Sequence, residues 1–187
     1  MSDNQTIFLV TAGTSFANPP VVYEAMEQVL RTLGANPGRG GHAMAVGAEG
    51  EIDRTRSGLA RLFSIRDHQR LIFTLNCTDA LNIAMKGYLR DGDHVITTVL
   101  EHNSVSRPLE QMAQDGTITL TRLPCSEEGY LDPGDVKNAF RPETTLVAMT
   151  HASNVVGTVQ PIREVGALVK ESKASFLVDA AQTAGVV

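Results

Sequence analysis

The sequence has 187 residues, of which 42% are hydrophobic and 20% are charged, and its formal net charge is -5. This composition is typical of a globular protein and not of a disordered chain, and scattered basic residues argue against a nucleic-acid partner, which needs a basic face. The apolar runs are strand-sized, which argues against a membrane span of about 20 residues. No secretory signal is visible at the N-terminus.

The two cysteines, Cys77 and Cys125, stand far apart and show no C-x-x-C spacing. This arrangement predicts a reducing compartment, with the cytoplasm as the expected location, and it predicts neither a disulfide framework nor a metal site.

Two amphipathic helices are predicted in the first third of the chain, because apolar residues recur there at helical spacing. The first begins near Pro19 and the second reaches Phe63, and the glycine-rich loop 36–42 separates them. The apolar positions are Val22, Met26, Val29 and Leu33 in the first helix, and Ile52, Leu59, Leu62 and Phe63 in the second.

From Leu71 onward, strand-sized apolar runs alternate with helical segments, which predicts an α/β fold with a largely parallel sheet. We expect Pro108 to limit how early the helix after the second strand begins, and we expect the four lysines to lie on helices with solvated side chains. The predicted strands are 71–75, 94–99, 117–123, 145–150 and 175–178, and the predicted helices between them carry 81–89, 105–112, 132–140 and 162–169.

Ligands of parallel sheets bind beyond the carboxyl ends of the strands, so the residues that follow each predicted strand are candidates for a site. Cys77 and Thr78 follow the first strand and open a helix, whose free N–H groups would bind an anion. The alternative is that Thr78 or Asn76 only caps this helix.

The second and fourth predicted strands are followed by His102 and Asn154. The His102 ring could stack on a planar heterocycle or transfer protons near neutral pH, and the alternative is a capped loop histidine. Asn154 would present an amide, and its alternative is a turn-forming role.

The fifth predicted strand ends at Asp179, with Gln182 just beyond it. A carboxylate there is costly to bury unless it meets a cation, such as a protonated pyridine nitrogen, and Gln182 could donate to a phenolic oxygen. The alternative for Asp179 is an arginine partner or a helix-capping role. Together, these strand ends offer the groups that pyridoxal 5'-phosphate (PLP) needs for its phosphate, ring face, O3' and pyridinium nitrogen.

Four segments resemble the class V aminotransferase family, and within it most closely the cysteine desulfurases. The glycine-rich loop 36–45 resembles that of a desulfurase-like subgroup, and the match runs from roughly Pro19 to the last residue. The four segments are Phe73–Asn82, Glu101–Ser104, His151–Gly157 and Val178–Gly185.

The resemblance implies the large domain of a fold type I PLP-dependent transferase, with an N-terminal segment over residues 1–18 and a partial PLP-binding domain over 19–187. It implies that Cys77 and Thr78 bind the PLP phosphate, that His102 stacks on the ring and that Asp179 pairs with the pyridinium nitrogen. Asn154 and Gln182 would contact O3'.

The activity that the resemblance implies is conversion of L-cysteine to L-alanine, with the sulfur passed to an enzyme cysteine in a homodimer. A sulfur-acceptor protein is a further partner that it implies. The segment Thr11–Ser15 departs from the Asn-Ala-Ala-Thr stretch of the family. The family's Schiff-base lysine would follow Val187, so we expect this chain to be inactive alone.

Two kinds of alternative stay open at this point. One is a different class V enzyme, such as a selenocysteine lyase, an epimerase or a transaminase, and the other is a noncatalytic truncated domain. A nucleotide-binding Rossmann domain is disfavoured, because no G-x-G-x-x-G motif follows a strand.

Overall fold

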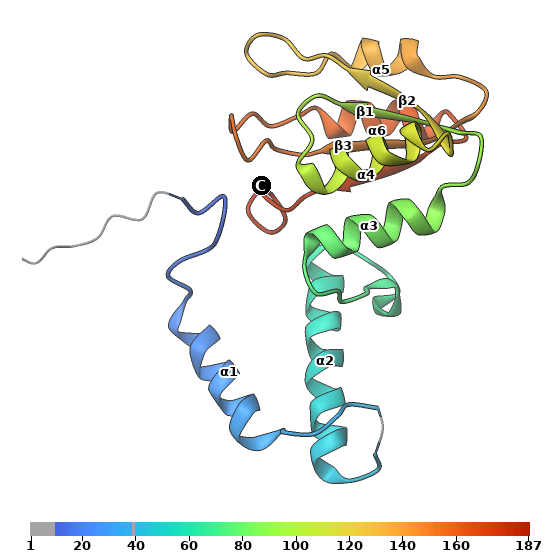
Figure 1. Ribbon diagram of the computed structural model, residues 1–187. Coiled ribbons are helices and arrows are strands. Elements are labelled where there is room, and N and C mark those ends of the chain that lie inside the picture. Colours follow the sequence, from blue (N-terminus) through green and yellow to red (C-terminus); the bar gives the residue numbers. More distant parts are fainter. Residues whose placement is uncertain (1–9, 39) are drawn as a thin grey trace, which may run out of the picture. The chain divides into compact units, whose positions relative to one another are not determined.

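The computed structural model describes residues 10–38 and 40–187. Arg39 of the glycine-rich loop and the first nine residues of the predicted N-terminal segment lie outside the described residues. The described residues divide into two compact units, with the boundary between Phe73 and Thr74 (Figure 1).

The first unit contains two long helices, as predicted. Helix α1 spans Pro20–Thr32 and α2 spans Ala43–Leu62, followed by the short 3-10 helix η1 at His68–Arg70. Helix α2 begins after His42, whose Nδ1 accepts a hydrogen bond from the N–H of Ala45. No residue of α1 is buried, although its apolar stripe follows the predicted helical spacing.

The segment 71–75 is not a strand, so this prediction is wrong. It is irregular, and Ile72 and Leu75 are 81% and 89% exposed. Arg56 donates to the Leu71 carbonyl and lies 5.4 Å from the centre of the Phe73 ring, and the N–H of Leu75 donates to Oδ2 of Asp79. An apolar run forms a strand only when a neighbouring strand takes up its hydrogen bonds, and none does so within residues 10–38 and 40–187.

The second unit is a parallel α/β layer structure, as predicted. Its strands lie in the order β2-β1-β3-β4, and every neighbouring pair is parallel. The strands are β1 (Asp93–Thr98), β2 (Ile118–Leu123), β3 (Thr144–Thr150) and β4 (Ser175–Asp179), and the helices are α3 (Cys77–Tyr88), α4 (Asn103–Gln114), α5 (Pro133–Ala139) and α6 (Ile162–Lys170).

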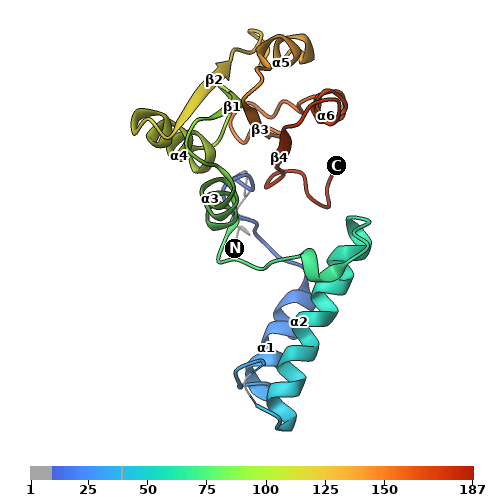
Figure 2. The ribbon, with the colours of Figure 1, turned by 90° about the vertical axis from the view of Figure 1, so that its right-hand side faces the viewer.

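Helices cover both faces of this sheet (Figure 2). Helices α3 and α4 pack on one face through Met85 and Leu109, which meet Val95 of β1. Helices α5 and α6 pack on the other face, where Val165 meets Ile96 of β1. Successive strand residues point to opposite faces, and strands buried on both sides therefore form nearly continuous apolar runs.

Pro108 lies inside α4, so the expectation that it delays the helix is wrong. The helix begins at Asn103, and proline at position 108 removes the N–H that would bond the carbonyl of Ser104. The Nδ2 of Asn82 donates to that carbonyl instead, at 3.3 Å. The prediction that all four lysines lie on helices is wrong for Lys173, which follows the end of α6. The other three lysines lie on helices as predicted.

Candidate cofactor site

The carboxyl ends of β1, β3 and β4 lie at one edge of the sheet, because the three strands are parallel and adjacent. The segments that leave this edge carry His102, Asn154 and Gln182, and Asp179 is the last residue of β4. The start of α3 reaches the same edge, where it contacts Asp179. All six predicted site residues therefore lie in the second unit, at the ligand-binding edge of a parallel sheet.

Asp179 is the most enclosed of the predicted site residues, with 5% exposure. Its Oδ1 accepts the N–H of Ala181 at 3.0 Å and lies 3.6 Å from the Sγ of Cys77. Among the described residues, no lysine or arginine forms an ion pair with it, and its Oδ2 accepts no hydrogen bond. A buried carboxylate with an unused oxygen and no cation in the protein suits a cationic ligand.

The first turn of α3 has free N–H groups. The Oδ1 of Asn76 accepts the N–H of Asp79 at 2.9 Å, so Asn76 is the N-cap and Thr78 is not. The N–H groups of Cys77 and Thr78 have no protein partner in the part of the chain that the structure describes, as is usual for a helix start. Two such groups at the positive end of a helix form an anion site.

The side chain of Cys77 is unsuited to act as a thiolate. Burial raises the pKa of its thiol, and the nearby Asp179 carboxylate raises it further. A raised pKa keeps the thiol protonated near neutral pH and lowers its reactivity.

His102 is the N-cap of α4. Its Nδ1 accepts the N–H of Ser104 at 3.2 Å and lies 2.7 Å from the Ser104 hydroxyl. A backbone N–H only donates, so Nδ1 carries no proton and the proton of the neutral ring is on Nε2. This N-cap bond holds the exposed ring in one orientation at the sheet edge, and the stacking role of His102 stays a prediction.

Asn154 and His102 line the same cleft, whose volume is about 420 Å3. Asn154 lies on the turn after β3, where Gly157 adopts φ 76° and its N–H bonds the carbonyl of Ser153. The cleft is lined by Val99, Leu100, Glu101, His102, Asn103, Ser153, Asn154, Val155 and Val156. The structure thus brings two predicted residues from different loops together.

Gln182 is half-buried in the turn that follows β4. Its neighbour Thr183 is buried, and the Thr183 hydroxyl lies 2.8 Å from Nδ1 of His151. The N–H of His151 also donates to the Asp179 carbonyl at 2.9 Å. These bonds tie the turn that carries Gln182 to the segment that carries Asn154.

Glu101 is a site residue to which the sequence analysis assigned no role. Its Oε1 accepts the Thr98 hydroxyl at 2.7 Å and the N–H of Thr150 at 3.1 Å, while its Oε2 is buried without a partner. Burial raises the pKa of Glu101 to about 7; Asp179 raises this pKa further, and the two hydrogen bonds and Arg122 oppose the shift. The sequence signal that could have identified Glu101 is a charged residue close after a buried apolar strand.

The residues at this edge fit the chemistry of a phosphorylated pyridine. An unused carboxylate oxygen suits the pyridinium nitrogen, free helix-start N–H groups suit the phosphate, and a flat ring and an amide line the cleft between β1 and β3. No group of three potential metal ligands occurs among residues 10–38 and 40–187. Of the helices in those ranges, none is long and apolar enough to cross a membrane.

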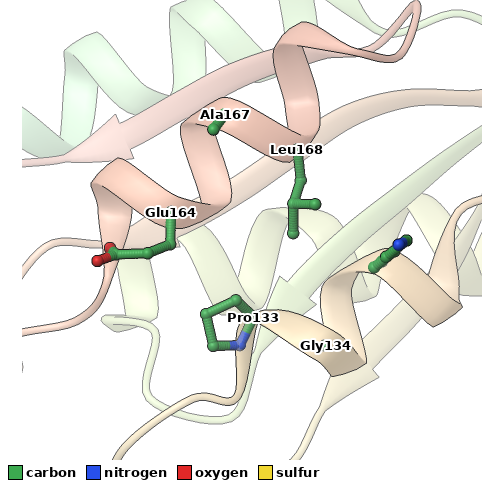
Figure 3. A pocket seen from close by; sticks show the side chains of 6 residues that line it. Pro133, Gly134, Glu164, Ala167 and Leu168 are labelled. Carbon is green, nitrogen blue, oxygen red and sulfur yellow. The ribbon is translucent and has the colours of Figure 1, made fainter.

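A second hollow, of about 410 Å3, lies between α5 and α6 (Figure 3). Its walls are helical residues, including Pro133 and Leu168, with Lys137 and Glu164 among them. No residue from a strand end lines it. The strand-end edge is therefore the better candidate site.

Most of the chain matches known proteins. The family model described as Aminotransferase class-V matches residues 7–186. A probable cysteine desulfurase of Halalkalibacterium halodurans is 32% identical over 95% of this chain, and cysteine desulfurase IscS of Psychromonas ingrahamii is 34% identical over 96%. The chain spans about half the length of these relatives, 45% of each.

Solved structures show the same likeness. The apo cysteine desulfurase from Thermococcus onnurineus NA1 superimposes with a TM-score of 0.85 at 30% identity, over 93% of this chain and 44% of that one. SspA in complex with cysteine also gives a TM-score of 0.85, at 29% identity, over 92% of this chain and 50% of that one. The fold is therefore that of the large domain of these enzymes, and the chain belongs to the class V aminotransferase family.

Proposed function

We propose that this chain is part of a PLP-dependent cysteine desulfurase, which converts L-cysteine to L-alanine and passes the sulfur to an enzyme cysteine. The observation that carries the proposal is the meeting of Asp179 with the start of α3, where the Cys77 Sγ lies 3.6 Å from Oδ1 of the carboxylate. This contact supports the proposal because it joins a carboxylate suited to a pyridinium and a helix start whose N–H groups suit a phosphate.

Each residue has a defined task in this proposal. Asp179 keeps the pyridine nitrogen protonated, and the N–H groups of Cys77 and Thr78 hold the phosphate. His102 covers the ring face, with its orientation fixed by Ser104. Asn154 and Gln182 orient O3', and Asn154 would also contact the substrate carboxylate. When bound, PLP supplies an electron-withdrawing ring that stabilises negative charge at the substrate Cα.

The sulfur acceptor is proposed to be neither cysteine of this chain. Burial raises the pKa of both Cys77 and Cys125, which disfavours the thiolate that would attack the substrate sulfur. The balanced transfer is L-cysteine plus an enzyme thiol giving L-alanine plus an enzyme persulfide. The thiol, the Schiff-base lysine, the partner subunit of a homodimer and a cytoplasmic location all belong to the proposal for the whole protein.

Two measurements test this function. PLP added to the 187-residue chain should change its absorbance spectrum on binding, at a stoichiometry of one. The protein expressed from its whole gene should form alanine and sulfide from L-cysteine. A different class V activity would be assigned if alanine formed from selenocysteine alone, if the amino acid were racemised, or if its amino group were transferred. A folded chain that binds no PLP would contradict the proposal.

A further inference from the structure

Glu101 links the ends of two strands that carry different parts of the candidate site. It follows β1 by three residues, yet its Oε1 accepts the hydroxyl of Thr98, the last residue of β1, and the N–H of Thr150, the last residue of β3. One carboxyl oxygen therefore joins two neighbouring strands at the point where each strand gives way to a loop.

The two loops that leave these strands form the cleft. His102 is the residue next to Glu101, and Asn154 lies four residues beyond Thr150. Glu101, His102 and Asn154 all line the same cleft. The bond from Glu101 to Thr150 is thus a direct side-chain link between the segment that carries His102 and the segment that carries Asn154.

The second oxygen of Glu101 makes this position unusual. Its Oε2 is buried and has no hydrogen-bond partner, and an unpaired buried polar atom costs free energy. An apolar residue would avoid this cost at Oε2 but would leave the N–H of Thr150 without its partner. Glu101 thus satisfies the donors at the ends of β1 and β3 at the cost of an unpaired Oε2.

We propose that Glu101 is a positioning residue that sets the separation between His102 and Asn154 across the cleft, so that His102 covers the ring face while Asn154 reaches O3' at the ring edge. The proposal rests on the proposed function, because the cleft needs a fixed width only if a rigid planar ring occupies it. Glu101 acts through its neighbours and is not assigned a contact with the ring.

The test uses the 187-residue chain and the substitutions E101M and E101Q. Methionine has a similar length but lacks the carbonyl oxygen, whereas glutamine keeps an oxygen at the Oε1 position that accepts both bonds. The matched control is E127Q, because Glu127 is exposed in the loop after β2. Amide hydrogen exchange is followed by NMR without PLP, and PLP affinity is measured by absorbance titration.

In E101M, the amides of Ser153 and Gly157 should exchange about tenfold faster, and PLP should bind about tenfold more weakly, because the link to Thr150 is lost. E101Q should rescue both properties to within about threefold of the wild type. Val169 belongs to the core between the sheet and helices α5 and α6. Its amide should exchange at the wild-type rate in all variants, which separates a local loosening of the loops from a general loss of stability.

Wild-type exchange at Ser153 and Gly157 in E101M would overturn the inference, and so would an E101Q chain as impaired as E101M. If E101M does not fold, T98V tests the same link, because it removes the hydroxyl that donates to Oε1 of Glu101. T98V should weaken PLP binding about threefold. Unchanged PLP affinity in T98V would count against the inference. A wild-type chain that binds no PLP contradicts only the proposed function, because the amide exchange measurement still tests whether Glu101 holds the loops in place.

Discussion

The Sγ of Cys77 lies 3.6 Å from Oδ1 of Asp179, although the two residues are 102 positions apart in the sequence. Cys77 opens α3 and Asp179 closes β4, so this contact joins a helix start to a strand end across the unit. It brings the positive end of a helix and a buried carboxylate to one place, which is the arrangement that a zwitterionic ligand with a phosphate and a pyridinium requires.

Replacing Asp179 with Asn should weaken PLP binding at least about tenfold, because the amide cannot pair with a pyridinium cation. Asparagine keeps the size of the side chain and an oxygen that accepts the N–H of Ala181. Absorbance titration measures the affinity, and Asp91→Asn at the exposed turn before β1 is the matched control. Equal affinity in the wild type and Asp179→Asn would remove Asp179 from the site.

The role of the Cys77 backbone can be separated from that of its side chain. Proline is well tolerated at the first position of a helix but has no N–H, and Asn76 before it already has the extended conformation that proline requires. Cys77→Pro should therefore bind PLP about tenfold more weakly than Cys77→Ala, which keeps the N–H. Equal titration curves for the two variants would show that this N–H does not hold the phosphate.

Asn76→Ala should lower the free energy of unfolding by about 1 kcal/mol, because it removes the N-cap of α3. The substitution removes the hydrogen bond from the N–H of Asp79 to Oδ1 of Asn76, at 2.9 Å. Urea unfolding measures the change. Asn138→Ala, at an exposed position inside α5, is the control and should change stability by no more than about 0.5 kcal/mol.

Glu101 should make the chain less stable as the pH rises from about 4.5 through 7. The folded state holds the proton up to a pKa of about 7, whereas the unfolded chain releases it near 4.5, so the folded state binds more protons over this range. The loss is at most about 3 kcal/mol. Urea unfolding at several pH values should show this decline in the wild type and not in E101Q, and parallel curves for the two proteins would contradict it.

His94, in contrast to Glu101, should make the chain less stable as the pH falls. The ring is fully buried, with Nδ1 2.7 Å from the Thr144 hydroxyl and Nε2 2.8 Å from the Thr121 hydroxyl. Burial lowers the pKa of His94, and Arg141 lowers it further while Glu143 opposes the shift. The unfolded chain therefore binds a proton more readily, and stability should fall as the pH falls below about 6.5.

His94→Gln should flatten this part of the pH profile while keeping one donor and one acceptor between the strands. The control is His68→Gln, on the short helix η1 of the other unit. A profile in His94→Gln that declines below pH 6.5 as steeply as the wild type would assign the acid sensitivity to other groups.

The sequence by itself determined the elements with strong periodic patterns. Helices α1 to α6 and strands β1 to β4 follow from apolar spacing and caps, because these signals are local in the chain. The parallel sheet followed from the alternation of strands and helices. The order of motifs placed Asp179 at a strand end and His102 and Asn154 beyond strand ends, and the structure has them there.

Only the tertiary structure decided what depends on distant partners. The run 71–75 has the composition of a strand, but its fate depends on whether another strand pairs with it. Pro108 is tolerated in α4 because Asn82, from another helix, satisfies the carbonyl that proline leaves free. The role of Glu101 depends on the N–H of Thr150, 49 residues away. Hydrogen bonds across such separations leave no periodic trace in a sequence, because either partner alone is an ordinary residue.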